Sequence, residues 1–368
     1  MTTTAASAVC LADLATAARS VTPDDVWDFV EGGSGAELSL VANRAALDDV
    51  YLVPRVLRDV SRPHASRVLL GTSTTMPVVV APMAYQRLLH PDGELAAARA
   101  ARSAGIPFTV PMLSSVAVEE VARSEADLWF QLYWLRDRAM TVDLLARAEA
   151  AGCRAIVLTV DVPLMGRRLR DLRNGFTLPR DVVAAHFPDA AATTQLQRAG
   201  TSAVAEHTRD AFDPSLSWSD IDWLRSATEL PIVLKGLLAP QDAARAARTG
   251  VDAVVVSNHG GRQLDGALPG IRALPAVRDA VDDSCDVLLD GGIRSGVDVV
   301  KALALGASGV LVGRPVLHGL ALDGTRGVED ALALLRAELD HALALAGCRD
   351  LGDAAGLATT TGTRGPGW

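Results

Sequence analysis

VDAVVVSNHGGRQLDG, from Val251 to Gly266, is the stretch that decides the fold. Its first six residues form an apolar run rich in valine, which is typical of a strand buried in a parallel sheet. A polar, glycine-rich turn follows directly, and α/β barrels carry their chemistry in such turns at the carboxyl ends of their strands. The stretch therefore predicts a parallel α/β fold with a functional site at this turn.

Two side chains in the turn have the chemistry for a site. His259 titrates near neutral pH, and Arg262 places a fixed positive charge three residues later. The glycines between them, Gly260 and Gly261, let the backbone lie close to a flat or bulky molecule. A base beside a guanidinium group suits a substrate with a proton to lose and a carboxylate to hold. A structural histidine in an ordinary turn is the alternative interpretation.

Length and composition restrict the class of protein. The chain has 368 residues, which suits one large barrel with additions or two small domains. Hydrophobic residues make up 49% and aromatic residues 4%, so we expect a core made mainly of Ala, Val and Leu. The formal net charge of −9, without a basic cluster, argues against a nucleic-acid partner.

The cysteines and the N-terminus favour a cytoplasmic protein. The cysteines are scattered without metal-ligand spacing, so we expect free thiols in a reducing compartment and no metal site. They are Cys10, Cys153, Cys285 and Cys348. The segment from Met1 to Ala6 lacks the basic region of a signal peptide, and no apolar run has the length of a membrane span. No membrane partner is expected.

Short apolar runs alternate with helical segments along the rest of the chain. Eight of these runs predict strands, at Val78–Ala81, Phe108–Val110, Leu128–Leu132, Ala155–Val160, Ile232–Lys235, Val251–Val256, Val287–Asp290 and Val310–Val312. Alternation in single file indicates a parallel sheet, and eight units favour a closed (β/α)8 TIM barrel over a doubly wound sheet. We expect a single domain over residues 1–368, with the barrel at about 75–346.

Helices are predicted before, between and after these strands. Two precede the barrel, at Leu11–Arg19 and Asp24–Glu31, and a long one closes the chain at Val328–Leu345. Those between strands are expected at Glu94–Ala104, Val118–Arg123, Thr141–Ala151, Ser219–Ala227, Gln241–Thr249 and Val297–Ala304. Residues 161–217 form a segment too long for a plain connection, so we expect an irregular, mobile lid loop there.

Polar side chains and glycines recur at the predicted carboxyl ends of the strands, where barrel enzymes place their sites. In chain order the candidates are Pro82, Met83, Ala84, Gln131, Tyr133, Thr159, Asp161, Arg168, Lys235, Ser257, His259, Asp290, Gly291, Gly292, Arg294, Gly313 and Arg314. Each could be an ordinary loop residue, but a purely structural role does not explain all of them together.

The last two strand ends predict a phosphate site. Backbone N–H groups at Gly291, Gly292 and Gly313 suit an anion, and Arg294 and Arg314 would add charge-assisted hydrogen bonds. The chain has no glycine fingerprint of a dinucleotide fold, which argues against NAD. A phosphorylated cofactor or substrate is therefore expected.

Three motifs, Asn258–Gly266, Asp290–Arg294 and Gly166–Arg168, resemble the FMN-dependent α-hydroxy-acid oxidase and dehydrogenase family. The resemblance runs from about Asp24 to Leu351 and implies FMN as the cofactor.

The resemblance also implies which residues hold the flavin. Lys235 matches a lysine against flavin N1 and O2, where a cation stabilises the reduced cofactor. The other matching positions are Pro82, Met83, Ala84, Gln131, Thr159 and Ser257, besides those of the phosphate site.

The resemblance also implies the catalytic residues. His259 matches the active-site base and Asp161 the acid that pairs with it, so the carboxylate is expected to raise the pKa of His259. Arg262 and Arg168 match the two arginines that bind the substrate's carboxylate. The neighbouring Arg167 has the same side chain, and Arg168 is chosen over it by the register of the motif alone. Tyr133 matches a tyrosine whose hydroxyl touches the substrate.

The chain departs from glycolate oxidase at three positions. Phe29 replaces a substrate-binding tyrosine, Pro111 a flavin-contacting serine and Leu113 a substrate-side tryptophan. A glycolate-sized substrate would leave such an apolar pocket underfilled. We therefore expect an aryl 2-hydroxy acid, with its ring among Phe29, Met83, Leu113 and loop residues.

Three further stretches, Ala84–Leu88, Gln131–Asp137 and Arg168–Asp171, most resemble members of the family that oxidise 4-hydroxymandelate. This implies oxidation of (S)-4-hydroxymandelate or mandelate to the 2-keto acid, which is 4-hydroxybenzoylformate in the first case, with O2 reduced to H2O2. Tyr85 or a loop residue would bond the para hydroxyl group. The family tends to form tetramers, so a homo-oligomer is expected.

Several alternatives stay open. Ala84 favours an oxidase, but a dehydrogenase using a quinone or another acceptor, or an oxidase for lactate or glycolate, fits most of the same residues. A different FMN barrel, such as an isomerase, has less reason to gather the histidine, the aspartate and both arginines. A lyase with Lys235 as a Schiff base and a non-catalytic binding barrel are the remaining alternatives.

Overall fold

The computed structural model describes residues 8–187 and 210–362. Eight parallel strands close into a barrel, and β11 pairs with β4 to complete it, with Val310 opposite Val78. The strands are β4 (Val78–Val80), β5 (Phe108–Pro111), β6 (Leu128–Leu132), β7 (Ala155–Thr159), β8 (Ile232–Leu237), β9 (Ala253–Val256), β10 (Asp286–Asp290) and β11 (Gly309–Val312). The prediction of a (β/α)8 TIM barrel is confirmed, and every predicted strand is present.

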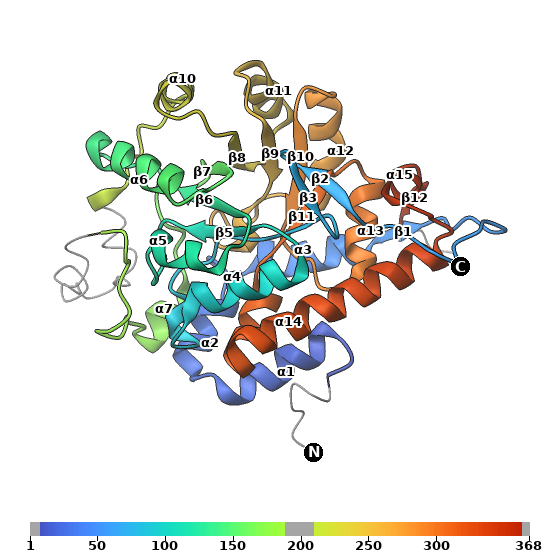
Figure 1. Ribbon diagram of the computed structural model, residues 1–368, viewed down its shortest axis with the longest axis horizontal. Helices are drawn as coiled ribbons and strands as arrows, with labels where there is room; N and C mark the ends of the chain where they lie inside the picture. The colour runs from blue at the N-terminus through green and yellow to red at the C-terminus, as the bar shows by residue number, and fades with distance from the viewer. Residues whose placement is uncertain (1–7, 188–209, 363–368) are drawn as a thin grey trace.

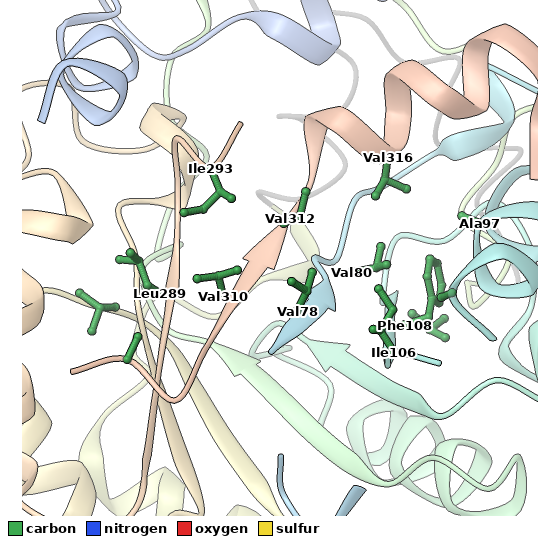
Figure 2. Close-up of a cluster of buried hydrophobic side chains, with 14 of the residues drawn as sticks. Val78, Val80, Ala97, Ile106, Phe108, Leu289, Ile293, Val310, Val312 and Val316 are labelled. Carbon is green, nitrogen blue, oxygen red and sulfur yellow. The ribbon is translucent and has the colours of Figure 1, made fainter. Parts of the chain in front are cut away.

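The barrel strands are buried on both faces, which is why their sequences read as continuous apolar runs. Val79 of β4 and Trp129 of β6 belong to an inner cluster that fills the barrel. Their neighbours along the strands, such as Val80, face outward and pack against the helices. Figure 2 shows part of this outer layer, around Val80, Phe108, Val312 and Val316. Successive side chains of a strand point to opposite faces, so alternate residues enter the inner cluster and the outer layer.

Helices surround the barrel (Figure 1). They are α4 (Gly93–Ala104), α5 (Val118–Val121), α6 (Arg138–Ala150), α10 (Trp218–Ala227), α11 (Pro240–Arg248), α12 (Gly270–Val281), α13 (Gly296–Ala304) and α14 (Arg314–Leu345). Two differ from the sequence prediction. The sequence predicts no helix at α12, which begins at a glycine and contains Pro275. The last helical span begins well before Val328, directly after β11, and is interrupted at Asp323 and Gly324, where the backbone is not helical.

The segments outside the barrel pack against its helices and against one end of its interior. Helices α1 (Leu11–Val21) and α2 (Asp24–Glu31) pack against α14, and α3 (Leu38–Asp48) follows (Figure 1). The hairpin of β2 (Arg67–Leu69) and β3 (Thr72–Thr74) places Leu69 in the inner cluster of the barrel. A short antiparallel pair joins β1 (Val50–Leu52) to β12 (Thr359–Thr361), next to α15 (Leu351–Ala355). The sequence did not predict either strand pair.

The segment 161–217 is less irregular than expected. It contains the short helix α7 (Leu169–Asn174), while residues 188–209 lie outside the described part of the chain. Its role as a mobile lid stays a prediction. Among the described helices, none combines the length and the apolar composition that a bilayer span requires.

Candidate active site

A cavity with about 1140 Å³ of empty space, its mouth included, opens at the carboxyl ends of the barrel strands. That is ample for a small-molecule site. Most of the residues predicted from the sequence line it. They are Phe29, Pro82, Met83, Ala84, Leu113, Tyr133, Arg168, Lys235, His259, Arg262, Asp290, Gly291, Gly292, Arg294, Gly313 and Arg314. The cavity lining does not include Gln131, Thr159, Asp161 and Ser257, which contact the lining residues or one another from behind.

His259 and Asp161 form a pair at the centre of the site. Nδ1 of His259 lies 3.0 Å from Oδ1 of Asp161, which leaves Nε2 as the ring nitrogen available to the cavity. His259 has a φ of 58°, a left-handed conformation, and its N–H donates to Oγ of Ser257 at 2.9 Å. Gly236 in β8 makes room for the acid, because a Cβ there would lie 2.6 Å from Cβ of Asp161. The chain therefore accepts local strain to place this pair.

Burial sets the protonation of the pair. It lowers the pKa of His259 below its ordinary value of 6.5, and this outweighs the raising effect of Asp161. The sequence predicted a raised pKa because it took account of the carboxylate alone. For Asp161, burial raises the pKa, but His259 and Lys235 lower it further, so the net pKa lies below the usual range. Near pH 7 the acid is ionised and the imidazole is neutral, which is the form of a general base.

Arg168 and Arg262 bring positive charge to the site without a carboxylate partner. Within residues 8–187 and 210–362, neither guanidinium group lies within ion-pair distance of an acidic side chain. Burial lowers the pKa of Arg168, and burial together with repulsion from Arg168 and Arg314 lowers that of Arg262 well below its usual range. An anionic ligand between them would supply the missing charge. Arg167, the neighbour passed over on register, is exposed.

Lys235 behaves differently from these arginines. Its Nζ lies 2.9 Å from Oδ2 of Asp290 and donates to Oγ of Ser257 at 3.1 Å. Burial lowers the pKa of Lys235, but the charges of Asp290 and Asp161 raise it further, and the net pKa lies above its usual value. Lys235 is therefore a charged ammonium group, which disfavours the Schiff-base alternative because that needs a neutral amine.

Gln131 and Thr159 form a hydrogen-bonded pair behind the lining of the cavity. Nε2 of Gln131 donates to Oγ1 of Thr159 at 3.1 Å, and Oε1 accepts the N–H of Met112 at 3.1 Å. Both residues are buried at the ends of neighbouring strands. A ligand ring that carries alternating hydrogen-bond donors and acceptors could replace the hydrogen bonds of Gln131 and Thr159 or add to them.

The last two strand ends have the features of an anion cradle. Gly291 and Gly292 have φ values of 95° and 85°, and a Cβ on Gly313 would approach Sδ of Met83 at 3.2 Å. Burial lowers the pKa of Arg294 to about 10, so this cation lacks full compensation. Such a site suits a phosphate group.

Next to the anion cradle, a buried polar atom suits a ligand with a hydroxylated chain. Oδ1 of Asp290 is buried and has no hydrogen-bond partner within the described residues. A ribityl hydroxyl group could donate to it. The residues present therefore fit FMN from the phosphate to the ring.

The structure adds residues that the sequence did not place. Phe176 stacks on Phe29 with ring centroids 4.7 Å apart, and Phe212 stacks on Tyr133 at 4.6 Å. Both come from the long segment after β7, where no periodicity indicates which side chains turn inward. Met165 also lines the cavity. Its position directly before the Gly166–Arg168 motif was the available sequence signal.

The fold and the site together define an α/β-barrel protein with a glycine-rich anion cradle beside a histidine–carboxylate pair and two arginines, the arrangement of a barrel enzyme that uses a phosphorylated cofactor. The family model described as FMN-dependent dehydrogenase matches residues 18–359, and the chain belongs to this family. Its cofactor is FMN, as the sequence predicted. The family assignment confirms the resemblance drawn from the motifs.

Known relatives cover nearly the whole chain. It is 55% identical over 354 residues to 4-hydroxymandelate oxidase of Amycolatopsis orientalis, covering 96% of this chain and 99% of that protein. It is 46% identical to L-lactate oxidase of Nostoc sp. over 332 residues, covering 89% and 91%. A crystal structure of mandelate oxidase with (S)-4-hydroxymandelic acid superposes with a TM-score of 0.94 at 55% identity, covering 96% of this chain and 99% of that chain.

Proposed function

We propose that this protein oxidises an aryl 2-hydroxy acid, (S)-4-hydroxymandelate or mandelate, to the 2-keto acid, with O2 reduced to H2O2. One observation carries the proposal: the pair of His259 and Asp161 faces a cavity in which Arg168 and Arg262 lack a counter-charge. The 55% identity to a 4-hydroxymandelate oxidase supports the substrate class. The substrate would supply both the acidic proton and the missing carboxylate.

The proposed roles follow from the charges. Arg168 and Arg262 hold the substrate carboxylate, because a guanidinium fork matches its two oxygens. Nε2 of His259 takes a proton from the substrate, and Asp161 stabilises the imidazolium that forms. Burial raises the pKa of Tyr133 to about 12, so its hydroxyl stays protonated and can donate a hydrogen bond to the substrate.

We propose that the flavin lies on the inner part of the cavity. FMN, when bound, accepts the two electrons that the substrate loses. The residues proposed to hold it are Pro82, Met83, Ala84, Gln131, Thr159, Lys235, Ser257, Asp290, Gly291, Gly292, Arg294, Gly313 and Arg314. The charge of Lys235 would stabilise negative charge on the reduced ring.

The ring of the substrate is proposed to lie against the apolar wall. Phe29, Met83, Leu113 and Met165 line the cavity, and Phe29 is only 6% exposed. We assign the contact with a para hydroxyl to Tyr85, which also lines the cavity. Burial raises its pKa, so the hydroxyl is neutral, and no residue in the described part of the chain forms a hydrogen bond with it.

An anaerobic absorption spectrum tests the proposal. Adding (S)-4-hydroxymandelate or mandelate to the holoenzyme is expected to bleach the oxidised flavin, and air is expected to restore it with H2O2. Bleaching with a dye acceptor but no peroxide would favour the dehydrogenase. A higher kcat/KM for lactate or glycolate than for mandelate would favour the alternative that the Nostoc relative represents.

We further propose a single catalytic domain in a cytoplasmic homotetramer. The four cysteines are all free thiols, which supports a reducing compartment. Light scattering of the purified holoenzyme checks the oligomeric state, and a dimer or monomer would exclude the tetramer.

A further inference from the structure

Two arginines of the site share one helix end. Nη1 of Arg262 donates to the carbonyl oxygens of Gly32 at 2.6 Å and Val30 at 3.3 Å. Nε of Arg314 donates to the same carbonyl of Val30 at 3.1 Å. These carbonyls belong to the C-terminal turn of α2, where unsatisfied C=O groups and the helix dipole attract cations. A helix outside the barrel thus orients one arginine after β9 and another after β11.

The side chain of Glu31 adds a charge to this helix end. Its Oε1 lies 2.9 Å from Nε2 of His318 and 3.8 Å from Nε of Arg314. Burial raises the pKa of Glu31, but the hydrogen bond to His318 and the charges of Arg314, His318 and Arg294 lower it to about 2. Glu31 is the acidic side chain that lies within ion-pair distance of Arg314 in the described structure.

His318 of α14 holds Glu31 and the end of α2 in place. It follows Arg314 by four residues on α14, so the two side chains lie on one helix face and both reach Glu31. The ring of His318 stacks on Trp27 of α2, with centroids 5.5 Å apart. It is also buried, at 3% exposure. Glu31 and Trp27 therefore hold α2 against the first turn of α14.

We propose that Glu31 is a positioning residue that, together with His318, sets the C-terminal turn of α2. Through this turn Arg314 faces the cofactor phosphate and Arg262 faces the substrate carboxylate. The substrate half of the inference rests on the proposed function, while the cofactor half rests on FMN binding alone. Cofactor affinity and substrate affinity are therefore coupled through α2, although α2 contributes no strand to the barrel.

The test compares two isosteric variants on the same helix. Glu31→Gln keeps the size and a possible hydrogen bond to His318 but removes the charge. The matched control is Asp28→Asn, because Asp28 lies 3.3 Å from Arg170 and does not contact Arg314 or Arg262. FMN affinity is measured by fluorescence titration of the apoprotein. KM and kcat for mandelate are then measured at saturating FMN.

We expect Glu31→Gln to weaken FMN binding about tenfold and to raise KM several-fold, with kcat within about threefold of the parent. Asp28→Asn is expected to change none of these values beyond twofold. His318→Phe retains a ring that can stack on Trp27 but loses the hydrogen bond to Glu31. It is expected to shift both affinities in the same direction, and it serves as the test if Glu31→Gln does not fold.

Three results would overturn the inference. Tighter FMN binding in Glu31→Gln would mean that Glu31 competes with the phosphate for Arg314. Weaker FMN binding with an unchanged KM would refute the coupling to Arg262. Equal behaviour of Glu31→Gln and Asp28→Asn would leave Glu31 a purely structural role. If no 2-hydroxy acid is oxidised at all, the proposed function fails, and the FMN titration still decides the cofactor half.

Discussion

The inner and outer parts of the cavity treat buried positive charge in opposite ways. On the inner floor, Lys235 is ion-paired with Asp290 at 2.9 Å, and its pKa is raised. On the outer side, Arg168 and Arg262 have no acidic partner in the described chain, and their pKa values are lowered. The protein balances the charge of Lys235 internally and leaves Arg168 and Arg262, the proposed carboxylate ligands, without an acidic partner in the described chain. Uncompensated buried charge, more than residue type, thus indicates where an anion binds.

The largest effect is expected from removing the balanced cation. Lys235→Met leaves Asp290 buried without its partner, so we expect the apoprotein to lose about 3–5 kcal/mol of unfolding free energy. Arg168→Met removes an unbalanced charge and is expected to leave the apoprotein as stable as the parent or more so. Urea denaturation of both apoproteins checks this. Equal losses in the two variants would refute the comparison.

The next effect concerns His259, the proposed base. His259→Ala is expected to lower the rate of flavin reduction by at least ~10²-fold, the scale for loss of a general base. FMN should remain bound, because the inner floor and the phosphate cradle are untouched. Anaerobic stopped-flow measures the rate, and the absorption spectrum measures bound flavin. A near-normal rate would remove His259 from its proposed role.

A smaller, pH-dependent effect follows from the same residue. As the proposed general base, His259 is active when neutral, so kcat/KM is expected to fall as the pH drops through its pKa. Burial lowers that pKa from 6.5, so the fall is expected below pH 6.5. Asp161 raises the pKa, so Asp161→Asn should move the fall to lower pH still, besides reducing the rate. A pH profile that moves upward in this variant would contradict the assignment.

The smallest effect is expected at the apolar wall. Tyr85→Phe removes one hydroxyl group, so kcat/KM for 4-hydroxymandelate should fall about three- to tenfold, the scale of one neutral hydrogen bond. The value for mandelate, which lacks the para hydroxyl, should stay within twofold and serves as the internal control. Equal losses on both substrates would place Tyr85 in packing alone.

The sequence predicted the barrel well because its strands are buried on both faces. Valine-rich runs such as Val254–Val256 then read as unbroken apolar segments, and their polar ends place the site residues at one rim. The three-residue strands β1 and β12 are too short to show a pattern. Helix α12 was missed because a glycine start and an internal proline are ordinarily loop signals.

The electrostatics of the site were less accessible from the sequence. The family resemblance implied that His259 and Asp161 are partners, but the net direction of the His259 pKa depends on burial, which residue spacing does not reveal. The contact between Glu31 and His318 joins positions 287 residues apart. Neither residue stands in a motif, so only the folded chain brings them together.

The pairing of β1 with β12 has a consequence for how the molecule matures. Val50 lies opposite Thr361, so the two strands can pair only after synthesis has passed residue 361. Helix α2, whose C-terminal carbonyls orient Arg262 and Arg314, packs against α14, so it too waits for a partner that follows the last barrel strand. A nascent chain that has not yet reached α14 would therefore lack the packing that positions α2 against Arg262, and we expect the site to be completed only after all barrel strands have been made.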